Sequence, residues 1–509
     1  MRTYILISCV AMVCLAGNVR ADEPPGSAGT YHRDLDPDGQ FDGADDVGAV
    51  RTAGVLRFDA DRQRYTLSGS GTNMWAAEDE FFFVWRKMSG DFIVSADAAF
   101  EGEGVDPHRK MGWIIRRDLD TSSPYVDVAL HGDGLTSLQF RRSAGAETEQ
   151  FESTVNAPDV LQLERDGDRF VMSVAKKGEA LTSTELSGVE LPDEVYVGLF
   201  ICAHNPDVVE TGTFSNVRIT VPAPDGFRPY QDYYASRLEI MDVETGHRRV
   251  VHTTPDSMQA PNWTRDGKAL IFNRNGRLYR FDLARGAAEE IDTNFAIRNN
   301  NDHALSFDGS MLAISHHSEA HGGDSIVYTV PVGGGKPELV TPQGPSYFHG
   351  WSPDGRWLTY TGGRDGAWDI YKTRSDGSGS EIRLTEHEAL DDGSEFAPDG
   401  ETIFFNSSRS GRMELWRMRA DGTGEQQLTD DEYNNWFPHP SPDGKRIVYL
   451  AYGPDVAADD HPWYRHVYLV LRDLSTGDSR VIANLYGGQG TINVPSWSPD
   501  GRYIAFVSN

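Results

Sequence analysis

The sequence predicts an all-β protein in which an N-terminal β-sandwich of jelly-roll type is followed by a six-bladed β-propeller. Three observations lead to this prediction. A short motif ending in Asp-Gly recurs six times in the second half of the chain, many short alternating strands fill the first half, and the two ends of the repeat region each hold part of a blade. Strand-rich repeats of about 40–50 residues are typical of propeller blades.

The recurring motif defines the blades. Its copies lie about 40 to 60 residues apart and end at Asp266, Asp308, Asp354, Asp399, Asp443 and Asp500. Each Asp-Gly pair is expected to close a tight turn, because glycine tolerates the positive φ that hairpin turns require. A β-branched or aromatic run follows each turn, as in residues 358–360 and 447–449. Each copy therefore predicts a hairpin made of the two inner strands of a blade.

The two ends of the propeller segment complement each other. Residues 237–241 and 248–251 precede the first Asp-Gly turn and have the pattern of two outer strands. Residues 503–507 have the pattern of an inner strand, and no outer strand follows them. We expect the N- and C-terminal strands to complete one blade together, which closes the ring without a free edge.

The first half of the chain has the signature of a sandwich. Residues 161–164 and 170–174 alternate between apolar and polar side chains, and an Asp-Gly turn separates them. Many short antiparallel strands at this spacing predict two packed sheets. Residues 89–92, 112–116 and 198–200 resemble the concanavalin-like sandwiches of lectins and glucanases. This resemblance implies a carbohydrate-binding surface, and no Glu-x-Asp-x-x-Glu pair points to glycoside hydrolysis there.

The start of the chain has the features of an exported protein. A charged residue, a short apolar run and a small-residue cleavage site ending at Ala21 are typical of a signal peptide. We therefore expect a periplasmic or secreted protein. The predicted segments are a signal peptide (1–21), a disordered acidic lead (22–46), a concanavalin-like sandwich (47–222), a linker (223–235) and a propeller (236–509).

Composition limits the partners. The formal net charge is −30, and such a surface repels nucleic acid and anionic membranes. Past the signal, no apolar stretch is long enough for a membrane helix. Cys202 is the one cysteine left after cleavage, so no internal disulfide is expected. We expect a monomer whose partner is a glycan or an envelope protein.

Candidate site residues lie just before the Asp-Gly turns, where the inner strands are expected to begin at one mouth of the channel. They are His303, His349, His439, Glu395, Asp392, Asn262 and Trp436. The symmetry of a propeller predicts that they converge on one funnel. Imidazoles and carboxylates from different blades could hold a divalent metal such as Zn or Mn, supply a general base, or line a water-filled mouth.

A second candidate lies in the acidic lead. The side chains of Asp34, Asp36, Asp38, Asp42 and Asp45 have the spacing of calcium-loop ligands, with Gly39 at the sixth position. An aspartate stands where such loops normally have a bidentate glutamate. The segment is either a calcium site or an acidic linker that enters the first strand.

The propeller segment resembles the TolB family. The resemblance rests on the repeated Ser-Pro-Asp-Gly motif, on the outer turns at 375–379 and 420–424, and on the Leu-Thr pairs at 384–385 and 428–429. In TolB an α/β domain precedes the propeller, whereas this chain has a sandwich there. Residues 303–310 and 438–441 also resemble oligogalacturonate lyases, which implies metal-ligand roles for His303 and His439.

Two functions compete. The first is an exported binding protein that holds a glycan or protein ligand in the propeller funnel and uses the sandwich as a second carbohydrate surface. The alternative is a metal-dependent carbohydrate-active enzyme, either a polysaccharide lyase or a glycoside hydrolase, with a His and carboxylate site in the funnel. A scaffold without a small ligand is a third possibility, because a fold does not fix a function.

Overall fold

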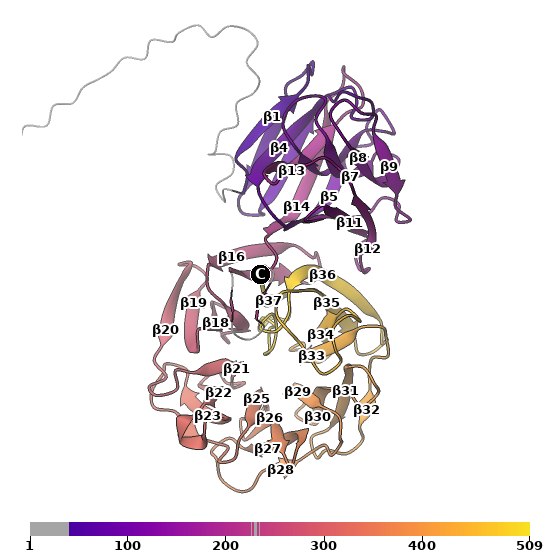
Figure 1. Cartoon of the computed structure of the whole chain (residues 1–509). Helices are drawn as coiled ribbons and strands as arrows, with labels where there is room; N and C mark the ends of the chain where they lie inside the picture. The colour runs from indigo at the N-terminus through magenta and orange to yellow at the C-terminus, as the bar shows by residue number, and fades with distance from the viewer. Residues whose placement is uncertain (1–39, 225, 229–231, 234) are drawn as a thin grey trace, which may run out of the picture.

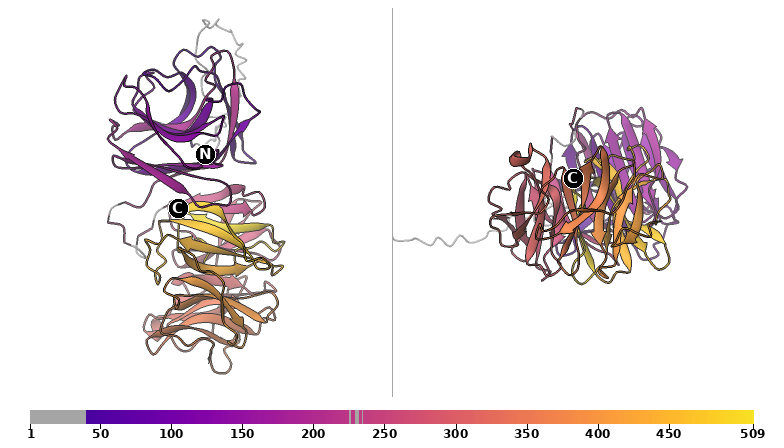
Figure 2. Two further views of the ribbon diagram at one scale, coloured as in Figure 1. Left: turned by 90° about the vertical axis from the view of Figure 1, so that its right-hand side faces the viewer. Right: turned by 90° about the horizontal axis from the view of Figure 1, so that it is seen from below.

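The computed structural model describes residues 40–509 except 225, 229–231 and 234. The chain forms two bodies, a sandwich and a ring of blades, that lie side by side (Figures 1 and 2). Nearly all regular structure is β-strand, together with a short 3-10 helix at Glu319–His321. Over the described residues, no helix has the length and apolar character needed to cross a membrane.

The sandwich consists of two seven-stranded antiparallel sheets. The first sheet contains, in spatial order, β1 (Gly43–Val47), β4 (Phe81–Met88), β13 (Val195–Cys202), β6 (Lys110–Arg116), β7 (Tyr125–His131), β8 (Thr136–Arg141) and β9 (Glu149–Glu152). The second contains β12 (Thr182–Ser187), β11 (Arg169–Ala175), β10 (Val160–Asp166), β5 (Phe92–Glu101), β14 (Glu210–Thr220), β3 (Arg64–Gly69) and β2 (Val55–Asp59). The predicted two-sheet sandwich is therefore confirmed.

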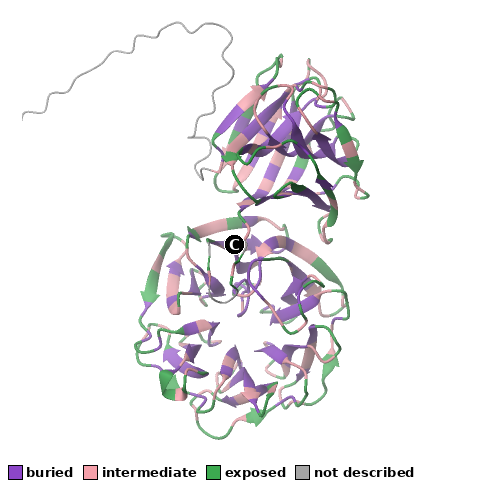
Figure 3. Ribbon diagram, viewed as in Figure 1, coloured by how far each residue is buried: buried purple, intermediate pink, exposed green. Residues whose placement is uncertain are grey.

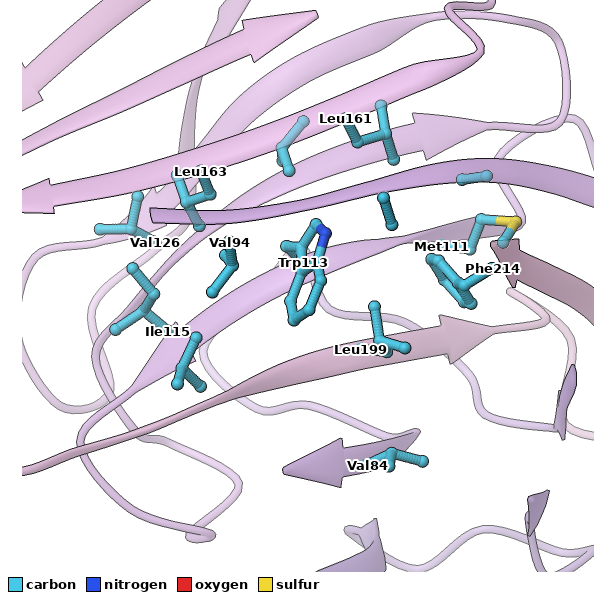
Figure 4. Close-up of a cluster of buried hydrophobic side chains, with 14 of the residues drawn as sticks. Val84, Val94, Met111, Trp113, Ile115, Val126, Leu161, Leu163, Leu199 and Phe214 are labelled. Carbon is cyan, nitrogen blue, oxygen red and sulfur yellow. The ribbon is translucent and has the colours of Figure 1, made fainter. Parts of the chain in front are cut away.

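The core of the sandwich follows from strand alternation. Met111, Trp113 and Ile115 project from one face of β6 because successive side chains on a strand point to opposite faces. They pack with Leu161 and Leu163 of the facing strand β10 (Figure 4). All five side chains are fully buried, so this layer holds the two sheets together by the burial of apolar surface.

The ring contains five four-stranded blades, each ordered from the innermost strand outward. These are β17 (Gln259–Trp263), β18 (Ala269–Arg274), β19 (Arg277–Asp282) and β20 (Ala287–Ile291); β21 (Asn299–Leu305), β22 (Met311–His317), β23 (Ser325–Pro331) and β24 (Glu338–Leu339); β25 (Ser346–Trp351), β26 (Trp357–Arg364), β27 (Ala367–Arg374) and β28 (Ile382–Arg383); β29 (Asp391–Phe396), β30 (Thr402–Ser407), β31 (Glu414–Arg419) and β32 (Gln426–Gln427); and β33 (Asn434–Pro440), β34 (Arg446–Tyr452), β35 (Arg465–Asp473) and β36 (Ser479–Gly487). The innermost strands are mostly buried and the outermost strands mostly exposed (Figure 3).

The sixth blade joins the two ends of the propeller segment. The C-terminal strand β37 (Tyr503–Ser508) pairs antiparallel with β15 (Ser236–Asp242), which in turn pairs with β16 (Arg248–Thr254). The innermost position of this blade is reduced to a single bridge between Trp497 and Ile504. The prediction of six blades, with the last strand completing the first blade, is confirmed.

The Ser-Pro-Asp-Gly motif has a structural explanation. Ser352 donates its hydroxyl hydrogen to Asp354 at 2.6 Å and accepts the amide hydrogen of Trp357 at 2.9 Å. Gly355 has a φ of 70°, which a side chain would disfavour. The same serine bonds occur in the turns at Ser441 and Ser498. The motif is therefore a turn-forming unit and not a functional signature.

A buried ionic cluster joins the two bodies. Glu239 of the propeller lies 2.6 Å from Arg218 of sandwich strand β14 and 2.8 Å from Arg248 of β16. Its Oε1 atom also accepts a hydrogen bond from Ser508 at 2.6 Å. All four side chains are buried, so the sandwich and the ring meet at the blade that holds both ends of the propeller.

Candidate functional site

A cavity of about 870 Å³ lies at one mouth of the ring, where the innermost strands begin. Two kinds of side chain dominate its wall. The amides are Gln259, Asn273, Asn275, Asn299, Asn300, Asn301, Gln489 and Asn493. The aromatic side chains are Tyr233, Tyr347, Trp368, Phe437 and Trp463. Such a wall offers hydrogen-bond donors, hydrogen-bond acceptors and flat apolar faces to one ligand.

Three titratable groups reach the cavity from consecutive blades. Asp302 comes from β21, His349 from β25 and Asp392 from β29. Each of these strands has an irregular register at this level, and so do β17 and β33. An irregularity of this kind inserts extra residues and re-aims side chains, which is why bulges are frequent at binding sites.

His349 and Asp392 form an ion pair in which the imidazole Nε2 atom lies 2.9 Å from the carboxylate Oδ1 atom. Thr361 donates a hydrogen bond of 2.6 Å to the same oxygen. Burial opposes charge on both groups, but their mutual attraction raises the pKa of His349 and holds the pKa of Asp392 well below its usual range. The imidazole Nδ1 atom has no hydrogen-bond partner among the described residues.

Asp302 differs from Asp392 in its hydrogen-bond and ionic partners. Its side chain is 5 % exposed, and Asn300 donates a hydrogen bond of 2.6 Å to its Oδ2 atom. Burial raises the pKa of Asp302 to about 6, the nearby Asp392 carboxylate adds to this effect, and His349 opposes it. Within the described residues, Asp302 forms no ion pair. The cavity wall therefore carries a buried carboxyl group without a counter-ion.

The other predicted histidines do not reach this cavity. His303 is fully buried, with its Nδ1 atom 3.0 Å from the Asn301 carbonyl and its Nε2 atom 3.3 Å from the Ile271 carbonyl of the preceding blade. His439 lies 2.6 Å from the Glu395 carboxylate and also contacts the Ile492 carbonyl. These imidazoles and Glu395 connect neighbouring blades.

Asn262 and Trp436 are also absent from the cavity wall. Asn262 donates to the Pro495 carbonyl at 2.6 Å and accepts from the Leu305 amide at 2.9 Å. Trp436 is fully buried and stacks on His461, with 4.3 Å between the ring centroids. Of the seven predicted residues, the cavity thus brings together His349 and Asp392. The expected convergence of all seven on one pocket is wrong, because the irregular registers of the innermost strands break the equivalence between blades on which the prediction relied.

A shared metal ion does not fit the predicted residues. The nitrogens of His303 face backbone carbonyls, and those of His439 face a carboxylate and a carbonyl. No group of three or more His, Cys, Asp or Glu side chains in the described part of the chain is arranged to hold an ion. The metal-ligand roles implied by the lyase resemblance therefore have no geometric support.

The calcium hypothesis stays a prediction. Asp34, Asp36 and Asp38 lie outside the described residues. Asp42 accepts the Lys87 amide hydrogen at 2.9 Å, and Asp45 accepts the Trp85 indole hydrogen at 2.8 Å. The two described carboxylates thus bond to strand β4.

Sequence reasoning missed most of the cavity wall. Trp368 and Asn273 lie near the turns between middle strands, and these turns were not among the six Asp-Gly copies from which the candidate residues were counted. The run from Asn299 to Asp302 was a usable signal, because four consecutive short polar residues are unusual in a buried strand. Tyr233 belongs to the segment that connects the sandwich to the ring, and its approach to the cavity depends on the tertiary fold.

Comparisons with known proteins identify the family to which the propeller belongs. The model of the TolB β-propeller domain, a PD40 repeat, matches residues 342–459. Uncharacterized protein Atu1656 of Agrobacterium fabrum is 48 % identical over 273 residues, which cover 53 % of this chain and 92 % of that protein. The chain belongs to the TolB-like propeller family. The matched length is close to that of the propeller segment, which indicates that the sequence similarity of this TolB-like protein to its relative lies in the ring.

One solved structure agrees with this family assignment. A structure from Agrobacterium tumefaciens whose name assigns it to TolB is 47 % identical to the TolB-like chain, with a TM-score of 0.52, and covers 54 % of this chain and 98 % of its own. An oligogalacturonate lyase of Vibrio parahaemolyticus is 14 % identical with a TM-score of 0.35, and the match covers 53 % of this chain and 78 % of the lyase. A similarity this distant carries no argument about function.

Proposed function

We propose that the TolB-like propeller is a binding protein whose cavity holds a saccharide. The observation that carries this proposal is the combination of amide and aromatic side chains on one wall. An amide group both donates and accepts, so it can match a sugar hydroxyl in either role. Aromatic rings offer broad apolar faces. The volume of about 870 Å³ lies within the range of small-molecule pockets.

The charges of the cavity argue against a polyanionic ligand. Among the lining residues that the structure describes, Arg298 is the one arginine and there is no lysine. Arg298 lies 3.8 Å from Glu319, so its charge is partly compensated. Asp302, Asp392 and Asp459 line the same cavity. A polyuronate would meet more carboxylates than cations here, and a saccharide without acidic groups fits better.

The rim of the cavity favours an extended ligand. Tyr233, Ile297 and Trp368 line the cavity and keep between 36 % and 42 % of their surface exposed. Exposed apolar side chains at the edge of a cavity provide further contact area for a bound molecule. An oligosaccharide would use both the interior and this rim.

The proposal extends to the sandwich and to the location of the protein. We propose that the sandwich is of the concanavalin-like type and provides a second carbohydrate surface. The signal-like start of the chain supports export to the periplasm or beyond, where extracellular glycans are available. Both statements rest on sequence patterns together with the presence of two packed sheets.

A glycan array probed with the full mature chain tests the proposed function. Hits should then be measured by isothermal titration calorimetry with neutral oligosaccharides of two to six units. We expect dissociation constants in the micromolar to low millimolar range, which is about −4 to −8 kcal/mol. If no saccharide binds at millimolar concentration while an envelope protein does bind the ring, the proposed function is wrong.

A further inference from the structure

The cavity contains a charge that the protein does not balance. Some buried carboxylates of this chain have cationic partners, such as Asp79, which lies 2.6 Å from Arg116 and 2.7 Å from Arg141. Asp127 and Asp302 form no ion pair within the described residues, and of these two Asp302 lines the cavity. Asp302 has the hydrogen bond from Asn300 but no ion pair within the described residues. Burying a carboxylate without a cation is costly, so this state suggests a missing partner.

Neighbouring cations are already engaged. His349 forms its ion pair with Asp392 at 2.9 Å, and Arg298 faces Glu319 at 3.8 Å. Neither is placed in an ion pair with Asp302. A cation that compensates Asp302 would therefore have to come from outside the protein.

Unused polar atoms on the same wall point to a ligand independently of charge. The Nδ1 atom of His349 and the Oε1 atom of Gln489 are buried and have no hydrogen-bond partner among the described residues. The His349 side chain is 4 % exposed. Buried polar atoms are normally satisfied, so each of these atoms needs a partner such as water or a ligand.

We propose that the saccharide bound by this cavity carries a protonated amine and that the Asp302 carboxylate is its counter-ion. This inference rests on the proposed function and names the ligand class more closely. An ammonium group has three donors, and Asp302 and Gln489 supply acceptors on the wall. The ring of Tyr347, which lines the cavity and is partly exposed, can further stabilise a cation in a partly dehydrated site.

The titration of Asp302 supports this assignment. Burial raises the pKa of Asp302 to about 6, and the groups that act on it electrostatically are His349 and Asp392. Asp302 and Asp392 in turn contribute to a raised pKa of Tyr347, mainly caused by burial, to about 12. A bound ammonium would favour the ionised carboxylate and bring the pKa of Asp302 back down.

Two matched probes test the inference. Glucosamine oligomers and N-acetylglucosamine oligomers of the same length differ in whether each unit carries an amine or a neutral amide. Titration calorimetry of both with the full chain at pH 7 should show at least tenfold tighter binding of the amine form. Asp302→Asn should remove this preference, so that the two oligomers bind the variant with affinities within about threefold of each other.

A surface substitution controls for net charge. Asp376→Asn removes one carboxylate from an exposed outer turn and should leave the tenfold preference intact. Equal affinity of the wild-type chain for the two oligomers, with both of them binding, would overturn the amine inference and leave the proposed function standing. Failure of both oligomers and of every other saccharide on the array would overturn the two together.

Discussion

Glu239 at the junction of the two bodies and Asp302 in the cavity are both buried carboxyl groups, but their surroundings differ. Glu239 is fully buried and lies within 2.8 Å of both Arg218 and Arg248. Asp302 is 5 % exposed and has one amide donor, Asn300. The difference shows in their acidity. Burial opposes ionisation of both, yet the two arginines hold the pKa of Glu239 far below its usual range, whereas the pKa of Asp302 rises to about 6.

This contrast separates structural charge from functional charge. A buried carboxylate with two guanidinium partners is satisfied before any ligand arrives, so it can serve the contact between the sandwich and the ring. A buried carboxyl group without a cation is a cost to folding, and such a group is typical of sites that bind or react. Four substitutions test this contrast, and they are ordered by the size of the expected effect.

Glu239→Gln should have the largest effect. Removing the carboxylate leaves two buried arginines without a counter-ion, and breaking a buried pair costs about 3–5 kcal/mol. We expect the free energy of unfolding in urea at pH 7 to fall by this amount. The folded pKa of Glu239 lies below its unfolded value of 4.5, so its contribution to stability is lost as the pH falls below about 4.5. The wild type and Glu239→Gln should therefore differ less in their free energy of unfolding at low pH.

Arg237→Gln is the matched control for that experiment. Arg237 belongs to the same strand β15, and its guanidinium donates to the Asn509 carbonyl at 2.8 Å and to the Thr220 hydroxyl at 3.2 Å. Its loss should cost about 1–3 kcal/mol, less than the loss of Glu239, because its hydrogen bonds go to a carbonyl and a hydroxyl and not to the Glu239 carboxylate. An equal loss for both variants would mean that the ionic cluster has no special role.

Asp302→Asn should act in the opposite direction. The folded pKa of about 6 lies above the unfolded value of 3.8, so the wild type loses stability as the pH rises between these values. The asparagine variant lacks this loss, and without ligand we expect it to be about 1–3 kcal/mol more stable at pH 7. Thermal unfolding at pH 4 and pH 7 measures the difference, which should nearly vanish at pH 4. A variant less stable than the wild type at pH 7 would show that Asp302 is already compensated.

Trp368→Ala should weaken saccharide binding about tenfold, or about 1.4 kcal/mol, because the indole is 36 % exposed at the cavity rim and can stack on a sugar ring. Ile382→Ala is the control, since Ile382 is 42 % exposed on the outermost strand β28 of the same blade and does not line the cavity. Calorimetry with the best saccharide from the array measures both. If the two variants bind equally well, the rim does not contribute to the site.

His303→Gln should have the smallest effect. The imidazole contacts the Asn301 and Ile271 carbonyls, and glutamine retains a donor, so we expect a loss of stability of about 1 kcal/mol. Saccharide affinity should stay unchanged, and adding Mn²⁺ or Zn²⁺ should not shift the unfolding temperature of either form. A metal-dependent stabilisation that disappears in the variant would restore the ligand role implied by the lyase resemblance.

The sequence alone determined the architecture. The Asp-Gly turns, the spacing of the repeats and the complementary ends predicted six blades with shared terminal strands, and alternating strands predicted the sandwich. These features are local, because a turn or an alternating strand is specified by a few neighbouring residues. The serine bonds at Ser352 and its equivalents show how closely the motif defines its turn.

The composition of the cavity wall, in contrast, depends on tertiary contacts. Counting from the Asp-Gly turns placed His303 and His439 beside His349, but irregular registers in the innermost strands direct these side chains toward neighbouring blades. Tyr233 reaches the cavity from the connecting segment and Trp463 from the loop between β34 and β35, so neither belongs to the Asp-Gly motif. A bulge depends on how two strands pair, and a cavity depends on which loops meet above the ring, so neither follows from the period of a single strand.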